Sequence, residues 1–345
     1  MSQPHDGQWT FCPFGNPFRS ILPKGSYLSS NLLALLNSFE QTLAESLKKL
    51  KPKDAPDVLG FSWMRHAMES LTEAHTNIKT LITDLQFPAS DWDEKWMDIY
   101  LDSNIKFLDI CIAFSSELSR LDQGQLLLQY VLDVLDFSNT SPSSEQLKQA
   151  SASLHDWMKQ FSSKSPRLEN CSSILQSFAQ TLHPTEVKNS AKGKVFMRAL
   201  YGVKVMTIFI CSIFAAALSG CSAPLVDLHV SDKFLWAEAF SDLQAVVNEE
   251  IRSQFSSGKV TILKELEAVE KYAERLHALI CCVRHEKIGT LAKIIDQEER
   301  QESVSNLAGA TEGLANGLDI LSKQVSDFFQ IVLTGRDALL SNLRE

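Results

Sequence analysis

The stretch from Val205 to Val226 runs for 22 residues without a charged side chain, which is about the length that a helix needs to cross a bilayer. Directly before it, between positions 188 and 204, the chain has five basic residues and no acidic one. They are Lys188, Lys192, Lys194, Arg198 and Lys204. A basic flank followed by an apolar helix is typical of a membrane anchor whose N-terminal side faces the cytosol. This segment therefore needs either a bilayer or a surrounding layer of other helices.

Three settings fit this segment. In the first, which we favour, it is the central helix of a bundle and is apolar on every face because other helices surround it. In the second it crosses a membrane once, where small residues such as Ser219 and Gly220 are tolerated because they permit close helix contact in lipid. In the third, the five basic residues bind anionic headgroups at a membrane surface. These five residues are therefore our candidate lipid contacts.

Helical periodicity dominates the rest of the chain, and we find no convincing alternating pattern of a strand. We expect an all-α protein, an elongated bundle of antiparallel helices joined by short connections, with one long apolar central helix over 191–219. A helix over 90–121 is expected to end at Gln123-Gly124, before a short one over 125–135. The last two helices are expected over 293–302 and 313–343, because three glycines between 307 and 317 weaken a helix locally.

Two regions are expected. Residues 1–25 read as an extended arm, because prolines recur at positions 4, 13, 17 and 23 between aromatic residues. Residues 26–345 read as one helical domain with hinges near 137–145 and 256–258, where Ser, Thr, Asn, Pro and Gly gather.

Net charge, cysteine content and the composition of the N-terminus indicate which partners and which compartment to expect. The net charge of -9 argues against nucleic-acid binding, which needs clustered Lys and Arg. Seven scattered cysteines and no secretory signal indicate a reducing compartment without disulfides. The N-terminus lacks the Ser- and Arg-rich composition of a transit peptide, so plastid import is disfavoured. We expect a cytoplasmic protein that contacts unidentified protein partners and an anionic membrane surface, and that holds no cofactor.

His277, Cys281 and His285 are spaced four residues apart, so one helical face would present two imidazoles and a thiol. Two histidines at this spacing can chelate zinc. A fourth ligand is not evident, however, and zinc sites normally have four ligands or three and a water. A partly buried helix with incidental histidines explains the pattern better, so these three residues stay weak candidates and no metal site is predicted.

No catalytic constellation stands out in the sequence. A serine nucleophile elbow, a phosphate-binding glycine loop and a zincin box are all absent. Neighbouring acids such as Glu249 and Glu250 lie in polar surroundings and read as solvated surface, whereas general acid–base catalysis needs one carboxyl of a pair to be buried. We therefore expect a protein that is not an enzyme.

Several longer blocks carry a family resemblance. They are FCPFGNPF (11–18), SWMRHAMESL (62–71), KNSAKGKVFMRALYGVKV (188–205), TILKELEAV (261–269) and GRDALLSNLR (335–344), together with the long run 78–129. Over nearly its whole length the chain resembles the BYPASS family of plant proteins. The blocks are long and unusual enough to make a chance match a poor explanation.

The resemblance implies a developmental role. Members of the family are plant-specific regulators needed for normal root and shoot growth, and they are regarded as restraining a mobile root-derived compound that arrests the shoot. No catalytic residues are known for the family, so none is carried over. Related plant proteins of similar helical type are linked to the exocyst, so an adaptor in membrane trafficking is the alternative. An enzyme, or an enzyme partner, acting on the precursor of the mobile signal is a further alternative.

Overall fold

The computed structural model describes residues 28–52, 60–87, 94–135, 142–161, 165–187, 190–258, 261–283 and 290–342. Within these ranges the chain forms nine α-helices and no strand, so the all-α prediction is confirmed. The helices are α1 (Ser30–Leu50), α2 (Phe61–Leu85), α3 (Glu94–Val134), α4 (Ser144–Phe161), α5 (Pro166–Thr181), α6 (Ala191–Ser219), α7 (Ala237–Ser256), α8 (Lys264–Val283) and α9 (Thr290–Asn342). The predicted arm over 1–25 lies outside the described residues.

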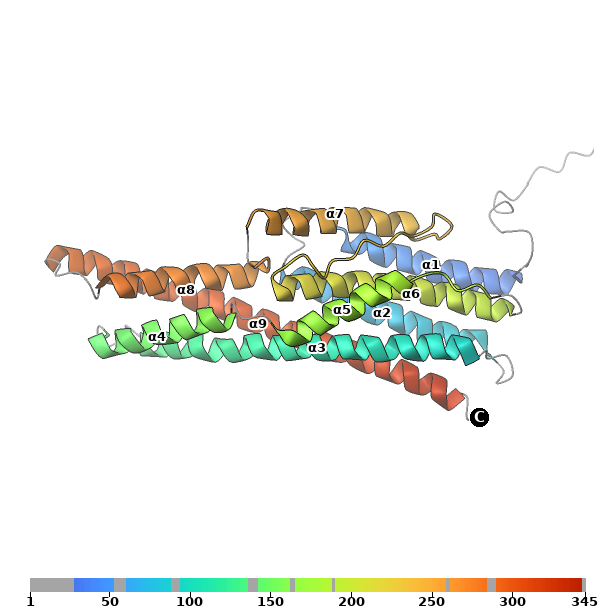
Figure 1. The fold of residues 1–345 in the computed structure, drawn as a ribbon, viewed down its shortest axis with the longest axis horizontal. Helices are drawn as coiled ribbons and strands as arrows, with labels where there is room; N and C mark the ends of the chain where they lie inside the picture. Colours follow the sequence, from blue (N-terminus) through green and yellow to red (C-terminus); the bar gives the residue numbers. More distant parts are fainter. Residues whose placement is uncertain are drawn as a thin grey trace, which may run out of the picture.

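The helices form an elongated bundle, in which α3 and α9 run along the molecule in opposite directions (Figure 1). At one end, α4 and α8 pack on each other and on parts of α3 and α9. The remaining helices, α1, α2, α5, α6 and α7, gather at the other end. The elongated antiparallel bundle expected from the sequence is therefore confirmed.

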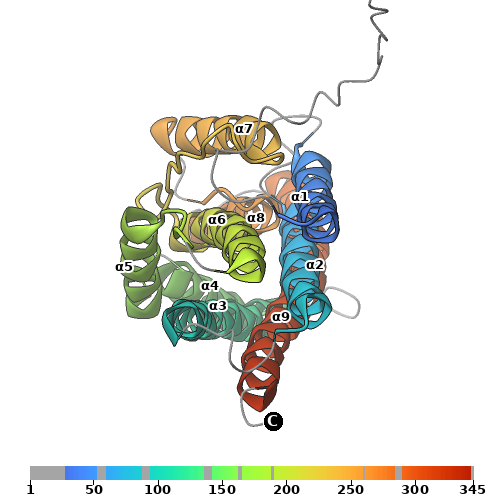
Figure 2. The same cartoon turned by 90° about the vertical axis from the view of Figure 1, so that its right-hand side faces the viewer.

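Helix α6 is the centre of the wider end, and it covers the residues predicted for it. Viewed along the bundle, it lies inside a ring formed by α1, α2, α3, α5 and α7, all of which contact it (Figure 2). The helix is long and apolar enough to cross a membrane, but 89% of its most apolar window is buried by other helices. The Ser190 hydroxyl caps its start by accepting from the Gly193 amide at 2.9 Å, and Gly220 ends it with a left-handed φ of 64°.

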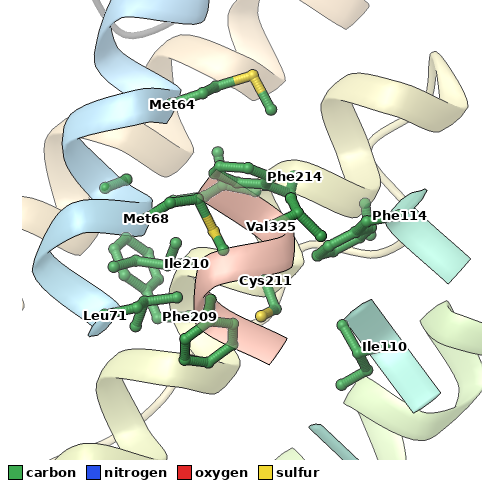
Figure 3. Close-up of a cluster of buried hydrophobic side chains, with 14 of the residues drawn as sticks. Met64, Met68, Leu71, Ile110, Phe114, Phe209, Ile210, Cys211, Phe214 and Val325 are labelled. Atoms are coloured by element: carbon green, nitrogen blue, oxygen red, sulfur yellow. The ribbon is translucent and has the colours of Figure 1, made fainter. Parts of the chain in front are cut away.

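Around the middle of α6 the core is close-packed. Figure 3 shows Phe209, Ile210, Cys211 and Phe214 of α6 meeting side chains of α2, α3 and α9. The Phe114 and Phe214 rings lie with centroids 5.7 Å apart. Each buried side chain of this size stabilises the fold by about 1.5–3 kcal/mol. An apolar surface on every side of α6 is therefore accounted for by the helices that cover it.

Two predicted helix breaks are wrong. Helix α3 continues through Gly124, which is buried, and a Cβ built there would lie 3.3 Å from the Trp157 indole nitrogen. That glycine permits close approach of α4. The two predicted C-terminal helices are one helix of 53 residues, because an apolar stripe that includes Leu307, Leu314 and Leu321 keeps it on the core.

The core also holds titratable groups that its packing keeps neutral. The imidazole Nε2 of His75 lies 3.0 Å from the Thr207 hydroxyl, and the rings of Phe107 and Phe328 meet the imidazole edge to face. Burial lowers the pKa of His75 to about 3. Burial also raises the pKa of the Cys111 thiol to about 12. All cysteines in the described ranges are free thiols.

Candidate functional site

Of the five basic residues named as lipid contacts, Lys188 lies outside the described residues and the other four belong to α6. The Lys192 ammonium donates to the backbone carbonyl of Gln86 at 2.8 Å, at the end of α2. Lys194 is half-buried. Both side chains therefore lie at the edge of the bundle, and the Lys192 ammonium already contacts the end of α2.

Arg198 is held inside the bundle by an ion pair with Glu40 of α1, a carboxylate that is 1% exposed. The pair is two-pronged, and its second hydrogen bond runs from Nη2 to Oε2 at 3.2 Å. Nη2 also donates to the carbonyl of Lys233 at 2.7 Å, and the guanidinium lies 4.8 Å from the ring centroid of Phe234. Glu40 Oε2 accepts in addition from the Leu235 amide at 2.9 Å. This network fixes the loop before α7 on α1 and α6.

Lys204 points to a different neighbour. Its ammonium lies 5.6 Å from the ring centroid of Phe178 in α5, and burial lowers its pKa. Arg198 and Lys204 therefore face α1 and α5 respectively, and the structure does not gather the basic residues of α6 on one exposed face. Lipid contact by these residues stays a prediction.

The second predicted cluster is only partly within the described residues, since His285 lies outside them. His277 Nε2 lies 3.8 Å from the Cys281 thiol on the same face of α8. The Cys281 sulfur also lies 3.8 Å from the Ser151 hydroxyl of α4, and the His155 and His277 rings have centroids 6.3 Å apart. Among the residues that the structure describes, no group of three or more His, Cys, Asp or Glu side chains is arranged to hold a metal ion. Burial, aided by nearby His155, lowers the pKa of His277.

A pocket of about 360 Å³ lies where the start of α5, the end of α6 and the segment leading into α8 converge over α3. Figure 1 shows these helix ends meeting near the middle of the molecule. We call it the helix-end pocket and define it by Glu117, Leu121, Leu168, Leu218, Gly220 and Leu266 in its wall. Sequence reasoning did not find this site, because its residues come from four separate parts of the chain.

The polar base of the helix-end pocket is a buried ion pair on α3. Glu117 is 1% exposed, and its Oε1 accepts from Arg120 Nε at 2.9 Å and from Nη2 of the same guanidinium. Arg120 Nη1 donates to the carbonyl of Gln160 at the end of α4, at 2.8 Å. Glu117 Oε2 is buried and has no hydrogen-bond partner within the described part of the chain. A sequence signal did exist: Glu117 lies in the apolar register of Phe114 and Leu121, where a charge is unexpected.

Comparison with known proteins decides the family. The family model described as "Protein ROH1-like" matches residues 29–166 and 156–343. The chain is 50% identical to Protein BPS1, chloroplastic, of Arabidopsis thaliana, across 100% of this chain and 93% of that protein. The chain belongs to the BYPASS family of plant developmental regulators. This BYPASS-family protein is also 44% identical to UPF0496 protein 4 of Oryza sativa subsp. japonica, over 100% of its own length and 97% of the relative's.

A more distant relative extends the comparison. Protein ROH1D of Arabidopsis thaliana is 20% identical over 88% of the BYPASS-family chain and 87% of its own. No solved structure matches the chain. The family resemblance inferred from the sequence blocks is therefore confirmed.

Proposed function

We propose that this BYPASS-family protein restrains a root-derived mobile signal that arrests the shoot, and that it does so without catalysing a reaction. The observation that carries the proposal is the 50% identity to Protein BPS1 over the whole chain. Identity at this level along the full length argues for a shared role rather than for a shared fold alone. The finer role comes from what the family resemblance implies.

Two groups with large pKa shifts are placed where they support a non-enzymatic role. His75 and Cys111 lie in the apolar core, 6% and 1% exposed, and their pKa values are shifted by burial. A catalytic acid, base or nucleophile must reach its substrate. These groups therefore serve packing.

Complementation tests the proposal. The full-length chain is expressed in Arabidopsis plants that lack BPS1, and root length and leaf formation are scored. We expect both to return toward normal, and we expect wild-type shoots grafted onto the complemented roots to keep growing. A Gly193→Trp variant serves as the unfolded control, because even a Cβ at this position would lie 2.0 Å from Trp96.

Failure of rescue by a chain that accumulates to normal levels would contradict the proposal. The alternative role as a membrane-trafficking adaptor predicts that exocyst subunits co-purify with the tagged chain from the same plants. Recovery of those subunits without rescue would favour the adaptor.

A further inference from the structure

We propose that the helix-end pocket binds a small amphipathic molecule with an uncharged or cationic hydrogen-bond donor, and that Glu117 accepts the donor. The inference stands on the geometry of the pocket and does not depend on the proposed developmental role. It assigns the pocket a ligand class with two defined parts, an apolar body and a donor group.

The size and walls of the pocket define the apolar part. A volume of about 360 Å³ falls in the range of pockets that enclose small molecules. Leu121, Leu168, Leu218 and Leu266 supply apolar walls from α3, α5, α6 and α8. Because the walls belong to four packed helices, the shape exists before a ligand arrives. A ring or a short branched chain would fill it.

The polar part follows from the unused oxygen of Glu117. A buried carboxylate oxygen normally accepts at least one hydrogen bond, since leaving it bare costs about 1–3 kcal/mol or more. Arg120 approaches only Oε1, and among the residues that the structure describes Oε2 has no hydrogen-bond partner. Glu117 lines the pocket but Oε2 is covered, so a rotation of the carboxylate toward the pocket would let a donor group of a ligand satisfy this oxygen.

The local charges select the sign of the ligand. Glu117 neutralises the Arg120 guanidinium, and Glu169 in the first turn of α5 adds a second carboxylate to the pocket wall. The C-terminal end of α6 contributes Leu218 and Gly220 to the wall and adds negative partial charge from its last carbonyls. The N-terminal end of α5 is positive, but Glu169 already offsets it. Anions are therefore disfavoured, and alcohols and amines are favoured.

A matched set of three probes tests the ligand class. They are 3-phenylpropanol, 3-phenylpropylamine and 3-phenylpropionate, which share an apolar body and differ in the donor, positive or negative end. Binding to the purified full-length protein is measured by saturation-transfer NMR and by titration. We expect the alcohol and the amine to bind with dissociation constants of about 1 mM or tighter, and the carboxylate at least about tenfold more weakly.

Three variants locate the binding. Ser172→Phe places a ring at the half-buried rim of the pocket and should abolish binding of all probes. Ser173→Phe makes the same change one residue along, at an exposed position outside the pocket wall, and should leave binding unchanged. Glu117→Gln keeps the shape but removes the charge, and should weaken binding of the amine about tenfold.

The binding results of the probes and variants either support or overturn the proposal. Binding of the alcohol and the amine that Ser172→Phe abolishes and Ser173→Phe preserves supports the proposal. Absence of binding by all three probes overturns it, as does equal or tighter binding of the carboxylate, or binding that Ser172→Phe leaves intact. If Glu117→Gln fails to fold, as its melting curve would reveal, the serine pair still decides the question.

Discussion

Glu40 connects three parts of the chain that are far apart in the sequence. Its carboxylate pairs with Arg198 of α6 and accepts from the Leu235 amide in the loop before α7, while the residue itself sits on α1. A buried pair of this kind is not a large source of net stability, because desolvation offsets the attraction. The pair instead determines that α1, α6 and the loop before α7 pack together.

Breaking this pair on one side should be costly. In Glu40→Gln the Arg198 guanidinium stays part-buried without a counter-charge, and we expect the free energy of unfolding to fall by about 3–5 kcal/mol. Urea denaturation followed by circular dichroism measures the change. Asp242→Asn is the matched control, since it removes the exposed Lys51–Asp242 pair and should cost at most about 1 kcal/mol. Equal losses in the two variants would contradict the structural role of Glu40.

His75 predicts a pH dependence of stability. The folded state keeps the imidazole neutral down to a pKa of about 3, whereas in the unfolded chain it binds a proton below about 6.5. Between these values the unfolded state holds more protons, so the contribution of His75 to the free energy of unfolding should fall as the pH drops from 6.5 toward 3 and stay constant above 6.5. Urea denaturation at a series of pH values measures the slope.

The His75→Leu variant isolates this contribution from that of the other titratable groups. Leucine fills similar space, and the Thr207 hydroxyl keeps its hydrogen bond to the Val203 carbonyl. The slope of stability against pH between 6.5 and 3 should become flatter than in the wild type. An unchanged slope would show that His75 does not carry the dependence.

For single residues, the sequence predicts which charges are buried but only some of their partners. Glu40 and Glu117 both interrupt apolar helical stripes, which marks them as buried charges with partners. Arg120 is three residues from Glu117 and could be paired with it by helix geometry. Arg198 is 158 residues from Glu40, and no local pattern links the two. Partner identity across such distances depends on the tertiary fold.

At the scale of elements, α9 shows why glycines alone predict breaks poorly. No atom of the described residues lies within 4 Å of a Cβ built at Gly309 or Gly313, whereas a Cβ at Gly317 would lie 2.2 Å from the Phe61 ring. The helix stays continuous because α2, α3 and α8 hold it along its length. Weak intrinsic propensity is outweighed by this packing.

These glycines give a matched pair of substitutions in one helix. Gly313→Ala should raise the free energy of unfolding by about 0.5–1 kcal/mol, because alanine favours the helix and has room. Gly317→Ala should lower it by about 1–3 kcal/mol, because its methyl group collides with Phe61. Thermal and urea denaturation of both variants measure the difference. Changes of the same sign would contradict the described contact of α9 with α2.

Helix boundaries can be predicted from the sequence only where they depend on local chemistry. The start and end of α6 follow from local chemistry, a serine cap and a left-handed glycine, and the predicted range agrees with the structure. Gly124 looks equally like a stop signal in sequence, yet it lies inside α3. The indole of Trp157 that needs the room comes from another helix, so the purpose of that glycine is not readable locally.

For the whole molecule, the covered position of α6 predicts how the protein fractionates. A tagged full-length chain from plant tissue should appear in the soluble fraction, or leave membranes when these are washed with high salt. The reason is that other helices bury 89% of the most apolar window of α6, which leaves little apolar surface for lipid. Retention through both high salt and alkaline carbonate would contradict this, because only a bilayer-spanning segment resists both.

The fold class and the central apolar helix were predictable, because they depend on periodicity and on the length of one charge-free run. The helix-end pocket was not. Its walls come from four elements that are separate in the sequence and whose ends meet only in the folded bundle. A site made of helix ends has no spacing rule in the sequence, unlike a motif on one helix.

The order of synthesis gives α9 a consequence for production of the protein in cells. This helix of 53 residues is made after α2, α3 and α8, and it covers all three. At about 5–20 residues per second, a ribosome needs about 3–10 s to complete this helix. During that time the apolar faces of the earlier helices are exposed to solvent. Nascent chains of this protein should therefore need chaperones most in the last seconds of translation, and any premature stop before Thr290 should yield an insoluble product.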